Sequence, residues 1–221
     1  MWGSIVQDLL YPGCAACGDL LQVDAVEHLG IHLCRGCAEA WPQRQPEPPQ
    51  PGRGSSYGPY GLWPYEGTVR RLIVQAKEQA YSAQAWALRR AVTLEASKMA
   101  ATWGWKATTC WCVAPPSWKR RRQDWYLPHF LLAGFSQASG FPRSRLLRRC
   151  GRSRDQADLN GEERRRNLRG RFRCRPGRRL PLEVVVVDDV NTTGATLRES
   201  MRALQEAGVK QVQGWAVAVV P

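Results

Sequence analysis

The 221-residue chain lacks features that define several large classes of protein. It has no run of eighteen apolar residues, so no segment is predicted to span a membrane. Its first eleven residues show no positively charged leader before an apolar run and no secretory cleavage pattern, so we expect a cytoplasmic protein. No internal repeat is present, which excludes a repeat array.

Acidic residues are scarce: 19 Asp and Glu stand against 32 Lys and Arg, for a formal net charge of +13. The imbalance is local, because residues 143–179 contain fifteen arginines and four acids, or +11 of that charge. Such a segment attracts polyanions and predicts binding of single-stranded DNA. The alternative to DNA binding is that these arginines only make the surface soluble or form ion-pair networks. A capping-box pattern at 160–163 predicts a short helix that follows it, and the arginines expected to bind DNA are Arg164, Arg165, Arg166 and Arg169.

A segment near the C-terminus combines a strand, two acids and a threonine-rich loop. Four consecutive valines at 184–187 are typical of a strand covered on both faces of a parallel sheet. Asp188 and Asp189 follow, and residues 191–196 then open a helix. The backbone N–H groups and hydroxyls of this loop suit a phosphate, whereas the acids suit vicinal hydroxyls and a divalent metal. The segment predicts a sugar-phosphate site; the alternative is a generic strand end in which Asp189 caps the helix.

Two Cys-x-x-Cys pairs, Cys14 with Cys17 and Cys34 with Cys37, lie near the N-terminus and are separated by sixteen residues. This spacing predicts a structural Zn²⁺ site, because four thiolates complete a tetrahedron and leave no open position for catalysis. Disulfides would require an oxidising compartment, and two tandem motifs serve a metal better than redox exchange. The other cysteines show no ligand spacing, and we expect them in the core: Cys110, Cys112, Cys150 and Cys174.

Seven prolines between residues 42 and 64 divide the chain. We therefore predict a zinc-binding module at 1–41, a Pro-rich linker at 42–64 and an α/β domain at 65–221. Within the last, helices are expected at about 69–77, 83–103 and 128–139, and strands at 108–114 and 184–187. A helix and a final strand at about 215–219 complete a β-α-β order. This alternation predicts a parallel sheet.

Residues 184–196 resemble the phosphoribosyl-diphosphate (PRPP) binding loop of type I phosphoribosyltransferases at every position. The resemblance implies that Asp188 and Asp189 are the catalytic pair and hold the ribose hydroxyls, that the loop holds the 5′-phosphate, and that Mg²⁺ accompanies PRPP. By position, the loop after the earlier strand would bind pyrophosphate. The implied PRPP-binding residues are Asp188, Asp189, Asn191, Thr192, Thr193, Gly194, Ala195 and Thr196, together with Ser117, Lys119 and Arg120.

The order of the parts, a four-cysteine module, a linker, an α/β body and the PRPP loop, is similar to that of the ComF family of competence proteins. Other family-like positions include Arg71 and Lys77, whereas residues 123–127 depart from the Arg-Gly-Phe-Asn-type stretch usual there. The resemblance implies a PRPP-binding protein that acts in DNA uptake during natural transformation, with a competence helicase or other uptake proteins as partners. The resemblance does not decide whether the chain catalyses transfer of the pentosyl group from PRPP. The alternatives are a metabolic phosphoribosyltransferase acting on a base or amine, and a non-catalytic nucleic-acid-binding adaptor.

Overall fold

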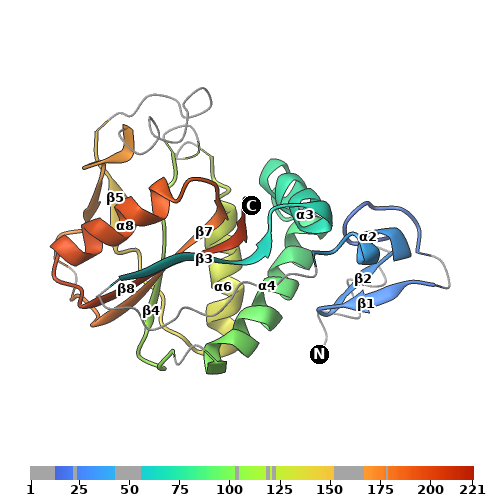
Figure 1. Cartoon of the computed structure of the whole chain (residues 1–221), viewed down its shortest axis with the longest axis horizontal. Helices are drawn as coiled ribbons and strands as arrows, with labels where there is room; N and C mark the ends of the chain where they lie inside the picture. Colours follow the sequence, from blue (N-terminus) through green and yellow to red (C-terminus); the bar gives the residue numbers. More distant parts are fainter. Residues whose placement is uncertain are drawn as a thin grey trace.

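The computed structural model describes residues 13–21, 24–42, 56–102, 105–117, 120, 123–151, 167–177 and 179–221. Figure 1 shows the four-cysteine module at one end of the molecule and the main sheet toward the other, with helices α3 and α4 between them. The four-cysteine module and the main sheet therefore form different regions of one structure.

The main sheet has four parallel strands in the order β3-β8-β7-β4. Their bounds are Ser56–Pro64 for β3, Cys110–Val113 for β4, Glu183–Asn191 for β7 and Gln211–Val219 for β8. The valine run explains the central position of β7, because successive side chains point to opposite faces. Val185 and Val187 lie in one core cluster and Val184 and Val186 in the other. The predicted strand covered on both faces is confirmed.

Helices cover both faces of the sheet (Figure 1). One face carries α3 (Gly67–Glu78), α4 (Ala83–Thr102) and α6 (Leu127–Ser139), and the other carries α8 (Ala195–Glu206) with the hairpin of β5 (Leu147–Arg149) and β6 (Phe172–Cys174). The predicted fold class, a parallel α/β sheet with a small four-cysteine module, is confirmed. Among the described helices, none has the length and apolar character needed to cross a membrane.

The second half of the expected linker is a strand rather than a linker. Ser56–Pro64 forms β3, which pairs with β8 and buries Leu62 and Trp63. Prolines led the sequence prediction away from a strand here. They are tolerated because β3 is an edge strand with a neighbour on one side only, where a missing N–H costs no sheet hydrogen bond. The division of the chain into three domains stays a prediction.

The N-terminal module contains the β1–β2 hairpin (Val26–His28 and Ile31–Leu33) and the short helix α2 (Arg35–Glu39). It packs directly on the first turn of α3. The hydroxyl of Thr68 donates to the Cys37 carbonyl at 2.6 Å, and the Thr68 N–H donates to the Ala40 carbonyl at 3.1 Å. Gly67 has a positive φ of 50°, and a Cβ there would collide with the Ala40 carbonyl. The module is thus closely fitted to the start of α3.

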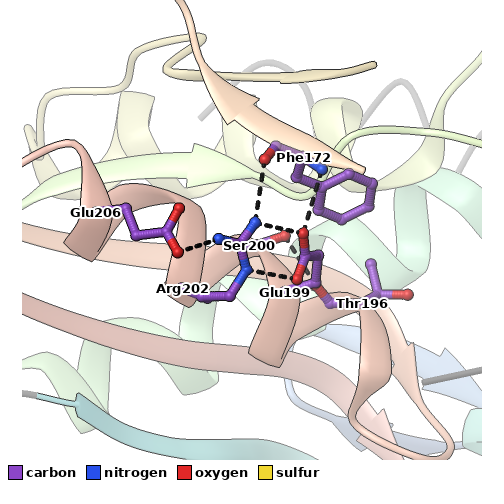
Figure 2. Close-up of polar contacts among 6 residues, drawn as sticks. All are labelled: Phe172, Thr196, Glu199, Ser200, Arg202 and Glu206. Carbon is purple, nitrogen blue, oxygen red and sulfur yellow. Dashed lines mark hydrogen bonds and ion pairs between the residues drawn. The ribbon is translucent and has the colours of Figure 1, made fainter. Parts of the chain in front are cut away.

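An ion pair between the buried Glu199 and the half-buried Arg202 ties α8 to the neighbouring hairpin (Figure 2). The carboxylate of Glu199 accepts hydrogen bonds from Arg202 at 2.6 and 2.7 Å and from the backbone N–H of Phe172 at 3.3 Å. Arg202 also pairs with Glu206 and donates to the Phe172 carbonyl at 3.4 Å. These contacts fix β6 against the helix that begins at the threonine-rich loop.

Candidate functional site

The acidic pair lies inside β7 rather than after it, since the strand continues to Asn191. Strand geometry therefore separates the two carboxylates. Asp188 lines a pocket with the threonine-rich loop, whereas Asp189 is reached by Lys77 of α3 from the other face of the sheet. Both acids remain at the carboxyl end of the central strand, where ligands of open parallel sheets bind.

The threonine-rich loop forms a small pocket of about 40 Å³ at the start of α8. Gly194 has a φ of 70°, which allows the chain to turn sharply into the helix. The buried Oδ1 of Asn191 has no hydrogen-bond partner within the described part of the chain, so this acceptor is available to a ligand. The pocket unites most of the predicted phosphate site: Asp188, Asn191, Thr192, Thr193, Gly194, Ala195 and Thr196, with Leu168, Val190 and Leu197.

Arg198, which the sequence prediction missed, brings a positive charge to this loop. It lies one turn into α8, and its guanidinium donates to the carbonyl of Thr193. A Cβ on Gly194 would come within 2.7 Å of the guanidinium. The sequence signal was an arginine four residues after the loop glycine, because residues at this spacing face the same side of a helix.

Two cations face Asp189, which is buried. The Lys77 ammonium lies 2.9 Å from Oδ1, and the Arg120 guanidinium lies 3.9 Å from Oδ2. The predicted pyrophosphate residues Arg120 and Ser117 are adjacent, since the Arg120 N–H donates to the Ser117 hydroxyl at 3.4 Å. Lys119 lies outside the described residues. The site thus sets basic groups from two separate segments beside the acidic pair.

Burial and the neighbouring charge of Asp189 raise the pKa of Asp188 to about 7. A hydrogen bond from the Asp189 N–H, at 2.9 Å, and the charges of Lys77 and Arg120 oppose this rise in pKa. A cation bound at the pair would favour the charged carboxylate. The pKa of Asp188 therefore depends on which charges lie beside the acidic pair.

Two residues of the stretch that departs from the ComF pattern, Trp125 and Tyr126, bond to backbone carbonyls near the acidic pair. Trp125 donates from Nε1 to the carbonyl of Ala76, next to Lys77, at 2.8 Å. Tyr126 donates from its hydroxyl to the carbonyl of Ala114, where β4 ends, at 2.9 Å. Burial, followed by the charges of Asp188 and Asp189, raises the pKa of Tyr126 well above its usual value.

The four N-terminal cysteines form a cluster whose Sγ atoms all lie within 4.8 Å of one another. Cys17 and Cys34 have their sulfurs 3.8 Å apart. A tetrahedral Zn²⁺ with Zn–S bonds of about 2.3 Å sets its sulfurs about 3.8 Å apart, so the cluster fits such an ion. The predicted metal-binding site is confirmed as a group of ligands that can hold a metal ion.

Local structure brings these sulfurs together. The first pair lies in a tight turn, where the Gly18 N–H donates to the Cys14 carbonyl at 2.8 Å, and the second pair begins α2. Although burial raises the pKa of Cys14, backbone hydrogen bonds outweigh it and lower the pKa to about 7. Arg71 of α3 donates to the Cys37 sulfur at 3.2 Å. Burial raises the pKa of Cys37 to about 11, so of these two cysteines only Cys14 is biased toward the thiolate that binds metals.

Other predicted residues have mixed outcomes. Cys110 and Cys112 are core residues, as predicted, whereas Cys150 and Cys174 are only half-buried, because the β5–β6 hairpin lies at the periphery of the core. Arg169 is exposed in the turn before β6. Arg164, Arg165, Arg166 and their predicted helix lie outside the described residues.

Comparison with known proteins supports the ComF resemblance over part of the chain. Across 75 residues the chain is 35% identical to Competence protein F of Haemophilus influenzae. The match covers 33% of this chain and 33% of that protein, so it spans a third of the relative's length. The chain is ComF-like within this segment, which confirms the resemblance seen in the residues.

Two further comparisons complete the set. No protein-family model matches the chain. Among solved structures it is similar to one described as the structure of the allosteric regulatory enzyme of purine biosynthesis, with a TM-score of 0.36 and 19% identity. That similarity covers 57% of this chain and 24% of the other.

Proposed function

We propose that this chain is a ComF-like, cytoplasmic protein that binds PRPP with Mg²⁺ at the carboxyl end of β7. One observation carries the proposal: the loop pocket joins Asp188 and Asn191 to residues 192–196, while cations gather at Asp189. A phosphate site next to carboxylates and basic groups suits a ligand that has a phosphate, vicinal hydroxyls and a pyrophosphate.

In this proposal the loop N–H groups and threonine hydroxyls hold the 5′-phosphate at the start of α8. Asp188 and Asp189 would accept hydrogen bonds from the ribose hydroxyls and would hold Mg²⁺, and Lys77, Arg120 and Ser117 would contact the pyrophosphate. When the ligand binds, the Lys77 ammonium would contact its pyrophosphate in addition to Asp189. The described side chains supply both signs of charge that the ligand requires.

The same arrangement suits displacement of pyrophosphate from the anomeric carbon of the ribose. The bond from that carbon to pyrophosphate breaks as the acceptor's bond forms, and negative charge builds on the departing group. Lys77 and Arg120 would neutralise that charge, and Mg²⁺, when bound, supplies further electrostatic stabilisation. We propose transfer to an acceptor as the reaction that follows PRPP binding.

A structural Zn²⁺ at the four cysteines is the second part of the proposal. Four protein sulfurs complete the coordination of a tetrahedral ion and leave no position for a substrate. The role assigned to the metal is to hold the two Cys-x-x-Cys turns together, because the resulting module packs on the first turn of α3.

The third part is a role in DNA uptake during natural transformation, through binding of single-stranded DNA by residues 143–179. The similarity to Competence protein F and the +11 charge of that segment support it. Exposed arginines of the segment on or beside the β5–β6 hairpin include Arg148, Arg169, Arg173 and Arg175. A competence helicase or other uptake proteins are the proposed partners.

Thermal unfolding with PRPP and Mg²⁺ tests the proposed sugar-phosphate site. Ligand at about 100 times its dissociation constant stabilises a protein by about 2.7 kcal/mol, a clear shift in melting temperature. We expect Asp188→Asn with Asp189→Asn to abolish the shift. The matched variant, Asp24→Asn with Glu27→Gln, removes two exposed charges from the module and should retain it. A wild-type protein with unchanged melting at millimolar PRPP would contradict the proposed site.

One further variant separates the proposed function from its alternatives. Changing Arg164, Arg165 and Arg166 to Glu should weaken binding of single-stranded DNA and flatten its salt dependence, which has a slope of about −0.7 per phosphate contacted. The PRPP shift should remain. PRPP binding without any DNA binding by the wild type would favour a metabolic phosphoribosyltransferase, and the reverse would favour a non-catalytic adaptor.

A further inference from the structure

A second, larger cavity lies at the edge of the main sheet, beside β4 and α6. Its volume is about 350 Å³, within the range of about 300–1,000 Å³ that is typical of small-molecule sites. It shares no lining residue with the pocket of the threonine-rich loop. Its lining consists of Val113, His129, Leu132, Arg143, Ser144 and Arg145.

The backbone holds the polar wall of this cavity against β4. The backbone N–H of Trp111 donates to the Pro142 carbonyl at 2.8 Å, and the backbone N–H of Ser144 donates to the Trp111 carbonyl at 2.9 Å. Arg143 thereby pairs with Trp111 as a short parallel extension of the sheet. In such an extended segment, residues two apart point to the same side. Arg143 and Arg145 are therefore presented together along one wall.

These arginines carry charge that the described residues do not neutralise. In the described ranges, neither Arg143 nor Arg145 forms an ion pair with a carboxylate. Arg89 adds to the positive field, since burial and then the charge of Arg143 lower its pKa. Uncompensated cations at a cavity create a local potential that attracts anions.

The remaining lining residues define what kind of anion fits. Val113 and Leu132 are buried apolar side chains, and they give the cavity an apolar floor. Burial, followed by the charges of Arg145 and Arg143, lowers the pKa of His129 to about 4, so its ring is neutral at pH 7. A neutral imidazole and the Ser144 hydroxyl can each donate and accept a hydrogen bond.

Tyr126 divides this cavity from the acidic pair. Its ring lies 5.4 Å from that of His129, while its hydroxyl is bonded to Ala114 and its pKa responds to Asp188 and Asp189. The cavity is thus next to the proposed PRPP site and separate from it.

We propose that this cavity binds a small organic anion, a carboxylate or phosphomonoester attached to an aromatic or apolar body. The anionic group contacts Arg143 and Arg145, the body lies on Val113 and Leu132, and His129 and Ser144 hydrogen-bond its polar atoms. Recognition needs both parts of the ligand, since the cavity offers both charge and an apolar floor. The proposal does not depend on PRPP binding.

Calorimetric titration of the full chain with phenyl phosphate and with benzoate tests this site. We expect saturable binding of at least one of them, and binding at least about tenfold weaker for benzyl alcohol and for inorganic phosphate, which each lack one part. Arg143→Gln with Arg145→Gln should weaken the preferred probe by about tenfold or more. Comparing the two aromatic probes decides whether a carboxylate or a phosphomonoester is preferred.

Two controls make the outcome specific. Arg148→Gln with Arg173→Gln removes the same charge from positions on β5 and β6 that are exposed, as Arg143 and Arg145 are, but lie outside the cavity lining, and it should retain binding within about twofold. Asp188→Asn with Asp189→Asn should also retain it, although it abolishes PRPP stabilisation. Equal losses in the two arginine pairs would overturn the proposal, as would equal binding of benzyl alcohol or no saturable binding of either aromatic anion.

Discussion

The ammonium of Lys77 lies 2.9 Å from Oδ1 of Asp189, which connects the last turn of α3 to the acidic pair on β7. Both side chains are largely buried, at 19% and 10% exposure. The same helix begins beneath the four-cysteine module, where Thr68 bonds to Cys37 and Ala40. One helix of 12 residues therefore contacts the metal-binding module at its start and the proposed ligand site at its end.

Lys77→Met should destabilise the protein by about 1–3 kcal/mol, because it leaves a buried carboxylate whose counter-charge, among the described residues, is the more distant Arg120. Urea unfolding measures the change. Lys106→Met is the matched control, since Lys106 pairs with Glu183 at 3.0 Å but is 69% exposed. The control should cost less than about 1 kcal/mol. Equal losses in the two variants would show that the buried pair has no special importance.

Trp125→Phe should weaken both stability and the response to PRPP. It removes the hydrogen bond to the Ala76 carbonyl, which holds the residue next to Lys77. The lost bond should cost about 1–2 kcal/mol. Trp86→Phe is the comparison, because Trp86 is 42% exposed and distant in sequence from the site. If thermal unfolding shows the same PRPP shift in both variants, the stretch 123–127 does not position Lys77.

The sequence predicted those elements whose signals are local. The four valines, the loop and the spacing of the cysteines each lie within short windows, and periodicity or spacing reports directly on them. Pairings across the fold were not visible in this way. Lys77 and Asp189 are far apart in the chain, and nothing in either local pattern selects the other. The three-residue strands β5 and β6 lie among arginines, where too few residues alternate to indicate a strand.

The placement of the two acids on β7 was also only partly predictable from the sequence. The sequence indicated a pair of acids after a strand, whereas β7 extends to Asn191 and separates Asp188 from Asp189. That extension depends on pairing with β8, where Val190 and Asn191 match Ala218 and Val219. A tertiary partner, rather than the valine run itself, decides where the strand ends.

Glu199→Gln should destabilise the packing of β6 on α8 by about 1–3 kcal/mol. The neutral amide cannot form the charge-assisted bonds to Arg202, although it can still accept from the Phe172 N–H (Figure 2). Hydrogen exchange at Phe172 and in α8 would report the change. Glu206→Gln, which alters the exposed partner of Arg202, should have a much smaller effect. Equal exchange in both variants would contradict a dominant role for Glu199.

Cys14→Ser should remove the metal and free the N-terminal module from α3. A structural Zn²⁺ contributes about 10–16 kcal/mol in isolated zinc peptides, so a lost ligand is poorly tolerated. Elemental analysis should find about one zinc per wild-type chain and much less in the variant. Cys150→Ser is the control, because Cys150 is a half-buried free thiol outside the cluster. A zinc-free wild-type protein would disprove the assignment of the metal.

The raised pKa of Asp188 predicts an opposite pH dependence for the free and the liganded protein. The folded pKa is about 7 against an ordinary value of 3.8, so its stabilising contribution is complete below about pH 3.8 and is lost as the pH rises through 7. Asp188→Asn cannot ionise, and it should gain about 1–3 kcal/mol relative to the wild type between pH 5 and pH 8. Denaturant unfolding at several pH values measures this gain.

Binding of Mg²⁺ and PRPP should reverse that trend in the wild type, because a cation at the acidic pair requires the ionised carboxylate. The stabilisation by the ligand should therefore increase from pH 6 to pH 8. The phosphate groups of PRPP also titrate in this range, since the second phosphate pKa is about 6, so the comparison must be made between variants. Asp24→Asn, an exposed control, should show the full increase with pH. Asp188→Asn should bind more weakly and show a flatter profile, and a profile as steep as that of Asp24→Asn would mean that Asp188 does not take part in binding the metal and its ligand.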